Sequence, residues 1–499
     1  NTTGANNTAV GGNALNVNTT GASNVAVGQT ALDANTTASN NTAIGYAALT
    51  ANTTGADNIA IGSGALVANT TGGDNVAIGR NALDANTTAN SNTAVGHVAL
   101  GANTTGDACV AVGANALDAN TTGDNNVALG SGSLGANTTA DNNTAVGASA
   151  LNANTTGADN AVLGSGALKT NTTGAQNTAI GRAAMQENTT ASNNTAVGYA
   201  ALIANTTGEE NTAVGQGALD ANTTADFNTA LGKDAMGATT TGHSNTGIGR
   251  YSLLTNTTGD YNVAVGRDAL RASTTSSNNT ALGFASLTAN TSGTQNVAVG
   301  ALALDANTTT SDSVAVGYAA LSAATIGSNT AVGSEAMQFT TTGANNVGVG
   351  LQALRTNTTG ADNVAVGKGA LDANTTASDN IAIGSNALTT NTTGTANVAV
   401  GTSSLEDNTT ASNNTALGAV ALANNTTGAA NVAVGTNALL TNVTAEANVA
   451  VGKDALKLNT VSNNTAVGAV ALGANTTGTQ NVAVGTYALD ANTTTSDSV

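Results

Sequence analysis

The string Asn-Thr-Thr recurs along the chain, and its residue types could support two kinds of chemistry. It matches N-x-[ST], the acceptor for N-linked glycans, at 25 of the 30 points where the string or its equivalent begins. Stacked copies could instead hydrogen-bond to one another as ladders at a turn, without any sugar. Both uses hold if only some copies are modified. The first eight candidates for a glycan or for a ladder are Asn1, Asn18, Asn35, Asn52, Asn69, Asn86, Asn103 and Asn120.

Residues for catalysis are scarce and separated. His97 and His243 occupy different positions of the repeat, and Cys109 replaces an Asn. A catalytic set needs a nucleophile, a base and an orienting group within reach of one another. The Gly-x-Gly strings, such as Gly62 to Gly64, lack the strand, helix and acidic residue of a dinucleotide fold. We therefore expect no enzyme, no catalytic residue and no cofactor.

The acidic residues do not follow a calcium-binding pattern. Asp33, Asp84, Asp118 and Asp220 are scattered over the repeats, and no G-G-x-G-x-D string of a calcium β-roll is present. We expect solvated surface carboxylates and no metal site.

Composition narrows the function classes further. Of 499 residues 60 are Gly and none is Pro, aromatics make up 2%, and charged residues make up 8%. A chain with so few large side chains can build only a thin core. The net charge of -18 disfavours binding to nucleic acid or to anionic lipid. No apolar run is long enough to insert into a membrane.

The whole chain is one array of 17-residue repeats. There are 29 full units and one partial unit, such as Asn18 to Ala34 and Asn52 to Ala68. We number the positions of each unit as slots 1 to 17 from the Asn of Asn-Thr-Thr. The units that start at Ala324 and Asn459 are one residue short. Because the last residues stop in mid-repeat, we expect a single domain, 1–499, that is a segment of a longer array.

Each slot tolerates its own residue types. Slot 10 is Val, Ile or Leu and slot 15 is Leu or Met, so these two slots are predicted to form the core. Slot 11 is always Gly, which indicates a corner with positive φ or no room for Cβ. Slots 9 and 14 are nearly always small, which indicates close packing beside them.

Charged and aromatic side chains gather in few slots. All Lys and Arg fall in slots 12 and 16, and slot 12 also accepts aromatic residues, whereas many acids lie in slots 5 and 6. We expect slots 5, 6, 12, 13 and 16 to face solvent or a partner. The candidate contact face comprises Tyr46, Arg80, Arg182, Tyr199, Lys233, Arg250, Arg267, Phe284, Tyr318, Lys368 and Lys453.

The pattern predicts an all-β fold, a parallel β-solenoid with one coil for each repeat. Slots 7 to 10 read as a β-branched strand, and Gly and Asn-Thr-Thr-Gly punctuate it. About 29 coils stacked at roughly 4.8 Å give a rod of about 140 Å. One coil buries too little to be stable alone, so its neighbours must stabilise it. Ice binding by the Thr rows is disfavoured, because slots 2 and 3 are adjacent and would point to opposite faces of a strand.

The string N-T/V-A-V/I-G resembles the head repeats of trimeric autotransporter adhesins over five slots of every unit. The resemblance implies a left-handed parallel β-roll, association as trimers, and binding to host surfaces. Those repeats are shorter, however, and neither a neck, a stalk nor a membrane barrel is seen here. The repeats also look like those of some phage tail-fibre proteins, so attachment to a cell is not implied.

We expect an extracellular or cell-surface structural fibre that self-associates laterally, as in a trimer, or end to end. The alternative is an adhesive, tail-fibre-like rod that binds a surface glycan or protein.

Overall fold

The computed structural model describes residues 2–499, and the chain divides into two compact units, Asn1–Asn245 and Thr246–Val499. Unit 1 contains β1 (Thr8–Val10), β2 (Val25–Val27), β3 (Thr42–Ile44), β4 (Ile59–Ile61), β5 (Val76–Ile78), β6 (Thr93–Val95), β7 (Val110–Val112), β8 (Val127–Leu129), β9 (Thr144–Val146), β10 (Ala161–Leu163), β11 (Thr178–Ile180), β12 (Thr195–Val197), β13 (Thr212–Val214) and β14 (Thr229–Leu231). Unit 2 contains β15 (Thr246–Ile248), β16 (Val263–Val265), β17 (Thr280–Leu282), β18 (Val297–Val299), β19 (Val314–Val316), β20 (Thr330–Val332), β21 (Val347–Val349), β22 (Val364–Val366), β23 (Ile381–Ile383), β24 (Val398–Val400), β25 (Thr415–Leu417), β26 (Val432–Val434), β27 (Val449–Val451), β28 (Thr465–Val467) and β29 (Val482–Val484).

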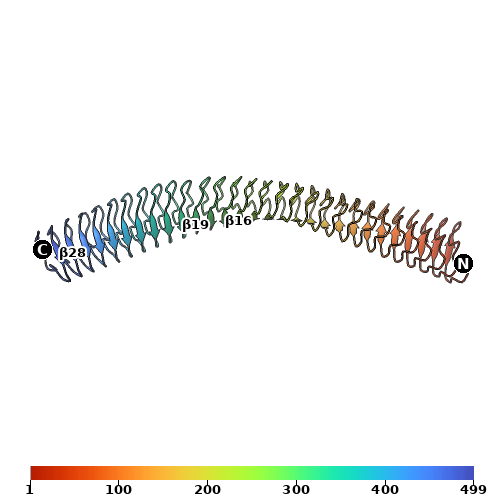
Figure 1. Ribbon diagram of the computed structural model, residues 1–499, viewed down its shortest axis with the longest axis horizontal. Helices are drawn as coiled ribbons and strands as arrows, with labels where there is room; N and C mark the ends of the chain where they lie inside the picture. Colours follow the sequence, from red (N-terminus) through yellow and green to blue (C-terminus); the bar gives the residue numbers. More distant parts are fainter. Residues whose placement is uncertain (1) are drawn as a thin grey trace. The chain divides into compact units, whose positions relative to one another are not determined.

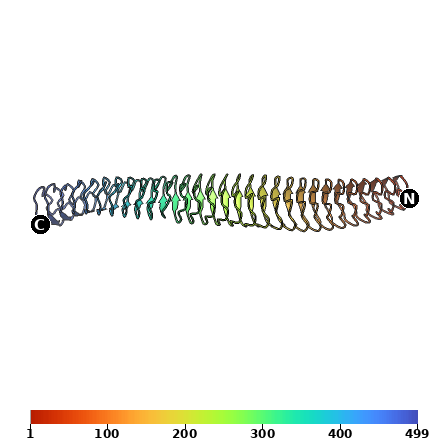
Figure 2. The ribbon, with the colours of Figure 1, turned by 90° about the horizontal axis from the view of Figure 1, so that it is seen from above.

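Within each unit, every strand pairs in parallel with the strand of the next repeat. Thr8 lies beside Val25, and Val263 lies beside Thr280, so neighbouring strands are related by one repeat. Figure 1 shows the strands of successive coils side by side, and Figure 2 shows the same row from a second direction. The predicted parallel β-solenoid with one coil for each 17-residue repeat is confirmed. The expectation that the whole chain is a single domain stays a prediction.

The predicted core at slot 10 is wrong. The strands consist of slots 8 to 10, and in β2 the middle residue Ala26 is fully buried whereas Val25 and Val27 are partly exposed. Further along the same row, Ile44 is 38% exposed and Leu163 is 51% exposed. Since side chains alternate between the two faces of a strand, slots 8 and 10 must point away from slot 9. The coil is so thin that the inward position holds Ala, and the large aliphatic side chains point outward.

The prediction that slot 15 is core is confirmed, and the small residue before it is buried as well. Ala31 and Leu32 are 0% exposed, and the same pair recurs in almost every coil. Slot 15 of one coil contacts slot 9 of the next, because a Cβ on Gly348 would meet the Cγ of Met337 at 2.8 Å. In this pair the longer side chain at slot 15 is accommodated by Gly at slot 9.

The Gly at slot 11 forms the corner after each strand, as predicted. Gly28 has φ of 136°, and a Cβ there would lie 2.3 Å from the carbonyl oxygen of Gly45 in the next coil. Both the backbone angle and the close approach of the neighbouring coil exclude larger residues. This corner turns the chain from the sheet toward slots 12 to 16.

Candidate functional site

The Asn side chains of slot 1 form a buried ladder along each unit. Asn35 is 0% exposed, and its Nδ2 donates to Oδ1 of Asn18 at 2.8 Å and to the carbonyl of Ala38 at 3.0 Å. Its Oδ1 accepts from Nδ2 of Asn52 at 3.2 Å. This rung is therefore satisfied by the coil before it, by the coil after it and by its own turn, as a buried amide requires.

A second ladder runs through slot 7. Oδ1 of Asn41 accepts from the backbone N–H of Asn58 at 3.0 Å, and its Nδ2 donates to the carbonyl of Gly55 at 3.0 Å. Cys109 occupies one rung and is buried, with Sγ 3.3 Å from the carbonyl of Gly123. Burial raises the pKa of this thiol to about 11, so it is neutral near pH 7 and a poor nucleophile.

The slot-1 ladder uses the atom that a glycan would need. From Asn18 to Asn120 every candidate is buried, and Asn1 lies outside the described residues. A sugar on Nδ2 of Asn35 would have to replace a hydrogen-bonding proton inside the coil stack. In the folded coils this nitrogen serves the ladder.

The ladder is incomplete where slot 1 is not Asn. Thr340 is 0% exposed, and its Oγ1 has no hydrogen-bond partner within residues 2–499. Oδ1 of Asn222 is likewise unpaired, because the next rung is Thr239. These positions are weak points of the stack, since an unsatisfied buried polar group costs about 1–3 kcal/mol.

The outward row of slots 8 and 10, which we call the sheet face, is mainly aliphatic and uncharged. Slot 10 is always Val, Ile or Leu, whereas slot 8 is Thr in 13 of the 29 strands, Ala in one and Val or Ile in the rest, with no charged residue in β1 to β29. Its largest members are well exposed, among them Leu129 at 37%, Leu231 at 46%, Leu282 at 45% and Leu417 at 47%. Contiguous exposed apolar surface of this kind typically marks an interaction site.

Slots 5 and 6, which we call the acidic edge, carry negative charge without any Lys or Arg. Oδ1 of Asp124 accepts from the backbone N–H of Asp107 at 2.8 Å, and Oδ1 of Asp141 accepts from the N–H of Asp124 at 2.7 Å. These carboxylates therefore help to join successive coils. The acidic edge comprises Asp57, Asp74, Asp107, Asp124, Asp141, Asp159, Glu209, Glu210, Asp226, Asp260, Asp312, Asp362, Asp379, Glu446 and Asp497.

The structure places every residue of the candidate contact face at slot 12, on the exposed outer surface just after the Gly corner. In each unit these side chains lie on one row, because the backbone at slot 13 bonds to slot 12 of the preceding coil, as from Ala47 to Gln29 at 3.0 Å. The candidate residues on this row, all of them exposed, are Tyr46, Arg80, Arg182, Tyr199, Lys233, Arg250, Arg267, Phe284, Tyr318, Lys368 and Lys453.

Arginine and lysine on this row have different neighbours. Every slot-12 Arg contacts a ring: Cζ of Arg182 lies 5.9 Å from the ring centre of Tyr199, Cζ of Arg250 lies 4.3 Å from that of Tyr251, Cζ of Arg267 lies 4.9 Å from that of Phe284, and Arg80 contacts His97. Within residues 2–499 no Lys lies over a ring. Lys233 and Lys453 approach the Asp that follows them, each at 3.9 Å, and Arg267 also pairs with the Asp that follows it, at 2.9 Å.

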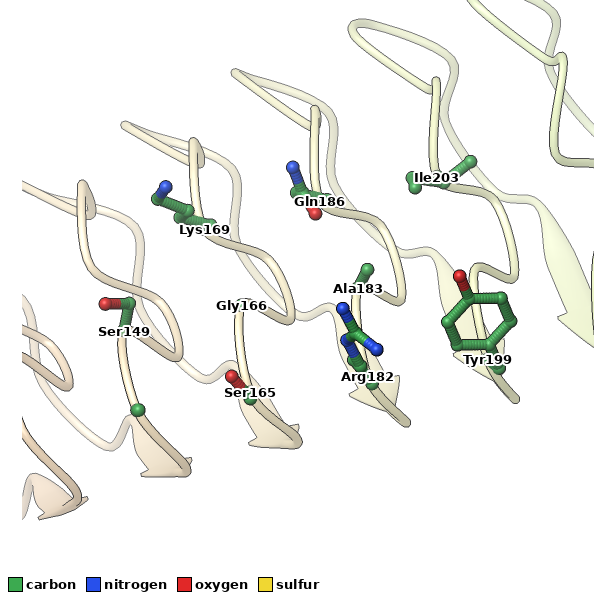
Figure 3. A pocket seen from close by; sticks show the side chains of 10 residues that line it. Ser149, Ser165, Gly166, Lys169, Arg182, Ala183, Gln186, Tyr199 and Ile203 are labelled. Atoms are coloured by element: carbon green, nitrogen blue, oxygen red, sulfur yellow. The ribbon is translucent and has the colours of Figure 1, made fainter.

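A hollow of about 400 Å³ lies beside the Arg182 and Tyr199 pair. It exists because the coil before Arg182 has the small residues Ser165 and Gly166 at slots 12 and 13. Figure 3 shows Lys169 and Gln186 on the row of slot 16 above it, and Ser165, Arg182 and Tyr199 on the row below. The lining is mainly polar, and it offers two cations, two hydroxyls, an amide and a phenol ring to one ligand.

Slot 16 carries partly buried carboxylates that were expected to be fully solvated. Burial raises the pKa of Asp84, Asp118 and Asp305 above 3.8, against weaker lowering by backbone hydrogen bonds. These groups lie singly on their coils, and no group of three metal-ligating side chains occurs within residues 2–499. Over the same residues there is no helix with the length and apolar character needed to cross a membrane.

Sequence reasoning identified slot 12 but missed the sheet face and the pairing of each Arg with a ring. A signal for the pairing was available, because Arg182 and Tyr199, like Arg267 and Phe284, are one repeat apart in the sequence. The repeats themselves provide the only family indication, since the chain matches no protein-family model and no curated protein sequence.

Proposed function

We propose that the protein is a non-enzymatic structural component of an extracellular or surface fibre, in which copies associate laterally through the sheet face. The observation that carries this proposal is the row of partly exposed Val, Ile and Leu side chains at slot 10, which continues through every strand. A solvent-facing sheet surface ordinarily carries polar residues in alternation with the core.

The area of the face is sufficient for a stable contact. Fourteen strands at about 4.8 Å spacing extend for about 65 Å, and a row about 10 Å wide then offers about 650 Å² in one unit. Two copies would bury about 1,300 Å² together, which lies within the range of specific interfaces. The largest apolar patch of a typical monomer is about 300–600 Å².

A second copy of this chain fits the face better than an unrelated partner. Its side chains recur at the strand spacing along β1 to β14 and again along β15 to β29. A surface with the same period meets every rung in the same way, whereas a surface of another period meets few of them. Association about an axis parallel to the strand row keeps this match for dimers and trimers alike.

Two variants with equal charge changes test the proposal. Val112→Lys with Leu129→Lys places two ammonium groups on the sheet face of unit 1, and Ile383→Lys with Val400→Lys places two on that of unit 2. Ala114→Lys and Ser131→Lys, with Ser385→Lys and Thr402→Lys, place the same charges at slot 12 of the same four coils, a slot where Lys233 and Lys368 already occur. Sedimentation equilibrium of both variants and of the unaltered protein gives the mass of each assembly.

We expect the unaltered protein and the slot-12 variant to sediment as the same multiple of 47.6 kDa, and the sheet-face variant as a monomer. Burial of an unpaired charge in an apolar contact costs several kcal/mol, which is enough to abolish association. An unaltered protein that remains monomeric at high concentration would refute the proposed assembly.

The second candidate is an adhesive rod that binds a surface glycan or protein. The exposed Arg and ring pairs of slot 12 favour it, because Arg and Tyr are enriched in residues that dominate binding energy.

A further inference from the structure

We propose that the Arg and ring pairs of slot 12 are binding subsites for the anionic groups of an acidic glycan, with the hollow beside Arg182 as the best-formed subsite. The proposal gives a ligand class to the adhesive alternative. It does not depend on lateral association, because slot 12 follows the Gly corner that ends the sheet face.

The geometry of the pairs suits carboxylate or sulfate recognition. A guanidinium is planar and presents parallel N–H donors to two oxygens, and a ring beside it limits its freedom before a ligand arrives. Arg267 lies beside Phe284 at 4.9 Å, and its Nε already pairs with Oδ2 of Asp268 at 2.9 Å, so a glycan anion would compete with that carboxylate. Nearby, Arg271 lies 5.4 Å from the ring centre of Tyr251 and 3.6 Å from Oδ1 of Asp268. Arg182 forms no ion pair within residues 2–499 and is therefore the better subsite.

Besides cations for the anionic group, the hollow offers hydrogen-bonding groups and an aromatic surface to the sugar ring. Lys169 and Arg182 lie on two successive coils at its border, Ser165 and Gln186 offer a hydroxyl and an amide, and Tyr199 is 54% exposed beside them. Polar groups that converge around an aromatic surface are typical of small-ligand sites. A volume of about 400 Å³ accommodates a short saccharide and leaves its ends free to continue along the row.

The charge of the whole protein makes such a site selective. With a net charge of -18, the chain repels a polyanion except where cations are concentrated. All Lys and Arg lie in slots 12 and 16, so an acidic glycan can approach only this side of the coil stack. The acidic edge of a second copy is a competing anion, but it lacks the sugar ring that the hollow and the exposed Tyr199 would accommodate.

The test compares two triple variants of equal charge on the full chain. Arg80→Gln, Arg182→Gln and Arg267→Gln remove three cations that contact rings, whereas Lys233→Gln, Lys368→Gln and Lys453→Gln remove three cations of the same slot that do not. Calorimetric titration uses hexagalacturonate as the carboxylate probe, a sulfated hexasaccharide as the sulfate probe, and maltohexaose as the neutral probe. The monomeric sheet-face variant is titrated as well, so that a failure of lateral association is distinguishable from a failure of glycan binding.

We expect binding of at least one anionic probe but not of maltohexaose, with an affinity about tenfold lower in the arginine triple and nearly unchanged in the lysine triple. The stronger anionic probe identifies the natural group as carboxylate or sulfate. Equal losses in the two triples would overturn the proposal, because they would show general charge attraction. Absence of saccharide binding would also overturn the proposal. If, in that case, the arginine triple lost self-association, the pairs would instead be contacts with a second copy of the chain.

Discussion

The slot-1 ladder and the sheet face reverse the usual distribution of polarity between the inside and the outside of a protein. The ladder is amide-rich and fully buried, as at Asn137, whereas the sheet face is aliphatic and exposed, as at Leu163. The inside of a thin solenoid has room for Ala, Leu and self-complementary amides, because each amide meets its own copy in the next coil. In a stacked repeat, complementarity to the neighbouring coil therefore decides what is buried, and hydropathy alone does not.

The largest expected effect follows from removal of one rung. Asn137→Ala deletes three hydrogen bonds, to Asn120 at 2.9 Å, to the carbonyl of Ala140 at 3.0 Å and from Asn154 at 3.0 Å. Since each bond contributes about 1 kcal/mol and its buried partners lose satisfaction, we expect a loss of about 3 kcal/mol. Amide hydrogen exchange measures the local opening free energy of these coils. Thr139→Ala, at an exposed position of the same turn, should change it little.

The next effect compares neighbouring residues of β3. Ala43→Ile adds volume at a fully buried position, and we expect a loss of about 2 kcal/mol through overpacking. Ile44→Thr changes a residue that is 38% exposed and shares its strand face with Thr42, so its effect should stay within about 0.5 kcal/mol in the monomeric sheet-face variant. Hydrogen exchange of the coils around β3 distinguishes the two. Equal losses would contradict the inward assignment of slot 9.

A repaired rung should stabilise the stack. Thr340→Asn supplies the amide that Asn357 lacks on one side and removes an unpaired buried hydroxyl, so we expect a gain of about 1 kcal/mol. Thr342→Asn places the same side chain at an exposed position of that turn and should be neutral. If the first variant loses stability, the ladder contributes less than its geometry indicates.

The smallest effects are pH-dependent and opposite in sign at two carboxyl groups. Burial raises the pKa of Asp118 above its unfolded value, so the folded state binds its proton more tightly and stability rises as the pH falls toward 3.8. The hydrogen bond from Asn437 is the main cause that lowers the pKa of Asp454, and ion pairs with Lys453 and Lys457 add to it, so this group loses stability as the pH falls below 3.8. Thermal unfolding between pH 3 and 7 should show that Asp118→Asn and Asp454→Asn shift the profile in opposite directions.

The repeat made much of the fold predictable. Comparison of copies within one chain showed where only Gly is accepted, as at Gly28, and where Leu or Met alone occurs, as at Leu32. Such constraints arise from contacts between identical coils, and they appear in the sequence as invariant slots. The prediction of one coil for each repeat needs only the repeat length, because identical units can stack in parallel whichever side chains point inward.

Hydropathy did not show which side chains of the strand point into the coil. An alternating strand allows either slots 8 and 10 or slots 7 and 9 to face inward, and the aliphatic residues favoured the wrong choice. The better signal was uniformity: slots 7 and 9 are almost always Asn and Ala, whereas slot 8 varies among Thr, Val and Ile. The pairs of Arg80, Arg182 and Arg267 join successive coils, so they become visible only when residues one repeat apart are compared, whereas Arg250 and Tyr251 are adjacent in the sequence.

The most direct test of the account is thiol labelling at one position of the sheet face. In Leu163→Cys the protein has two thiols, and the buried Cys109 serves as an internal control, with its pKa raised to about 11. Mass spectrometry after maleimide treatment counts the modified sites, with and without the four lysines of the sheet-face variant. We predict that position 163 is protected in the assembly and reacts once the four lysines are present, while Cys109 stays unmodified in both. Equal rapid labelling of position 163 in both backgrounds would contradict a sheet face covered by a second copy, and labelling of Cys109 would contradict the buried ladder.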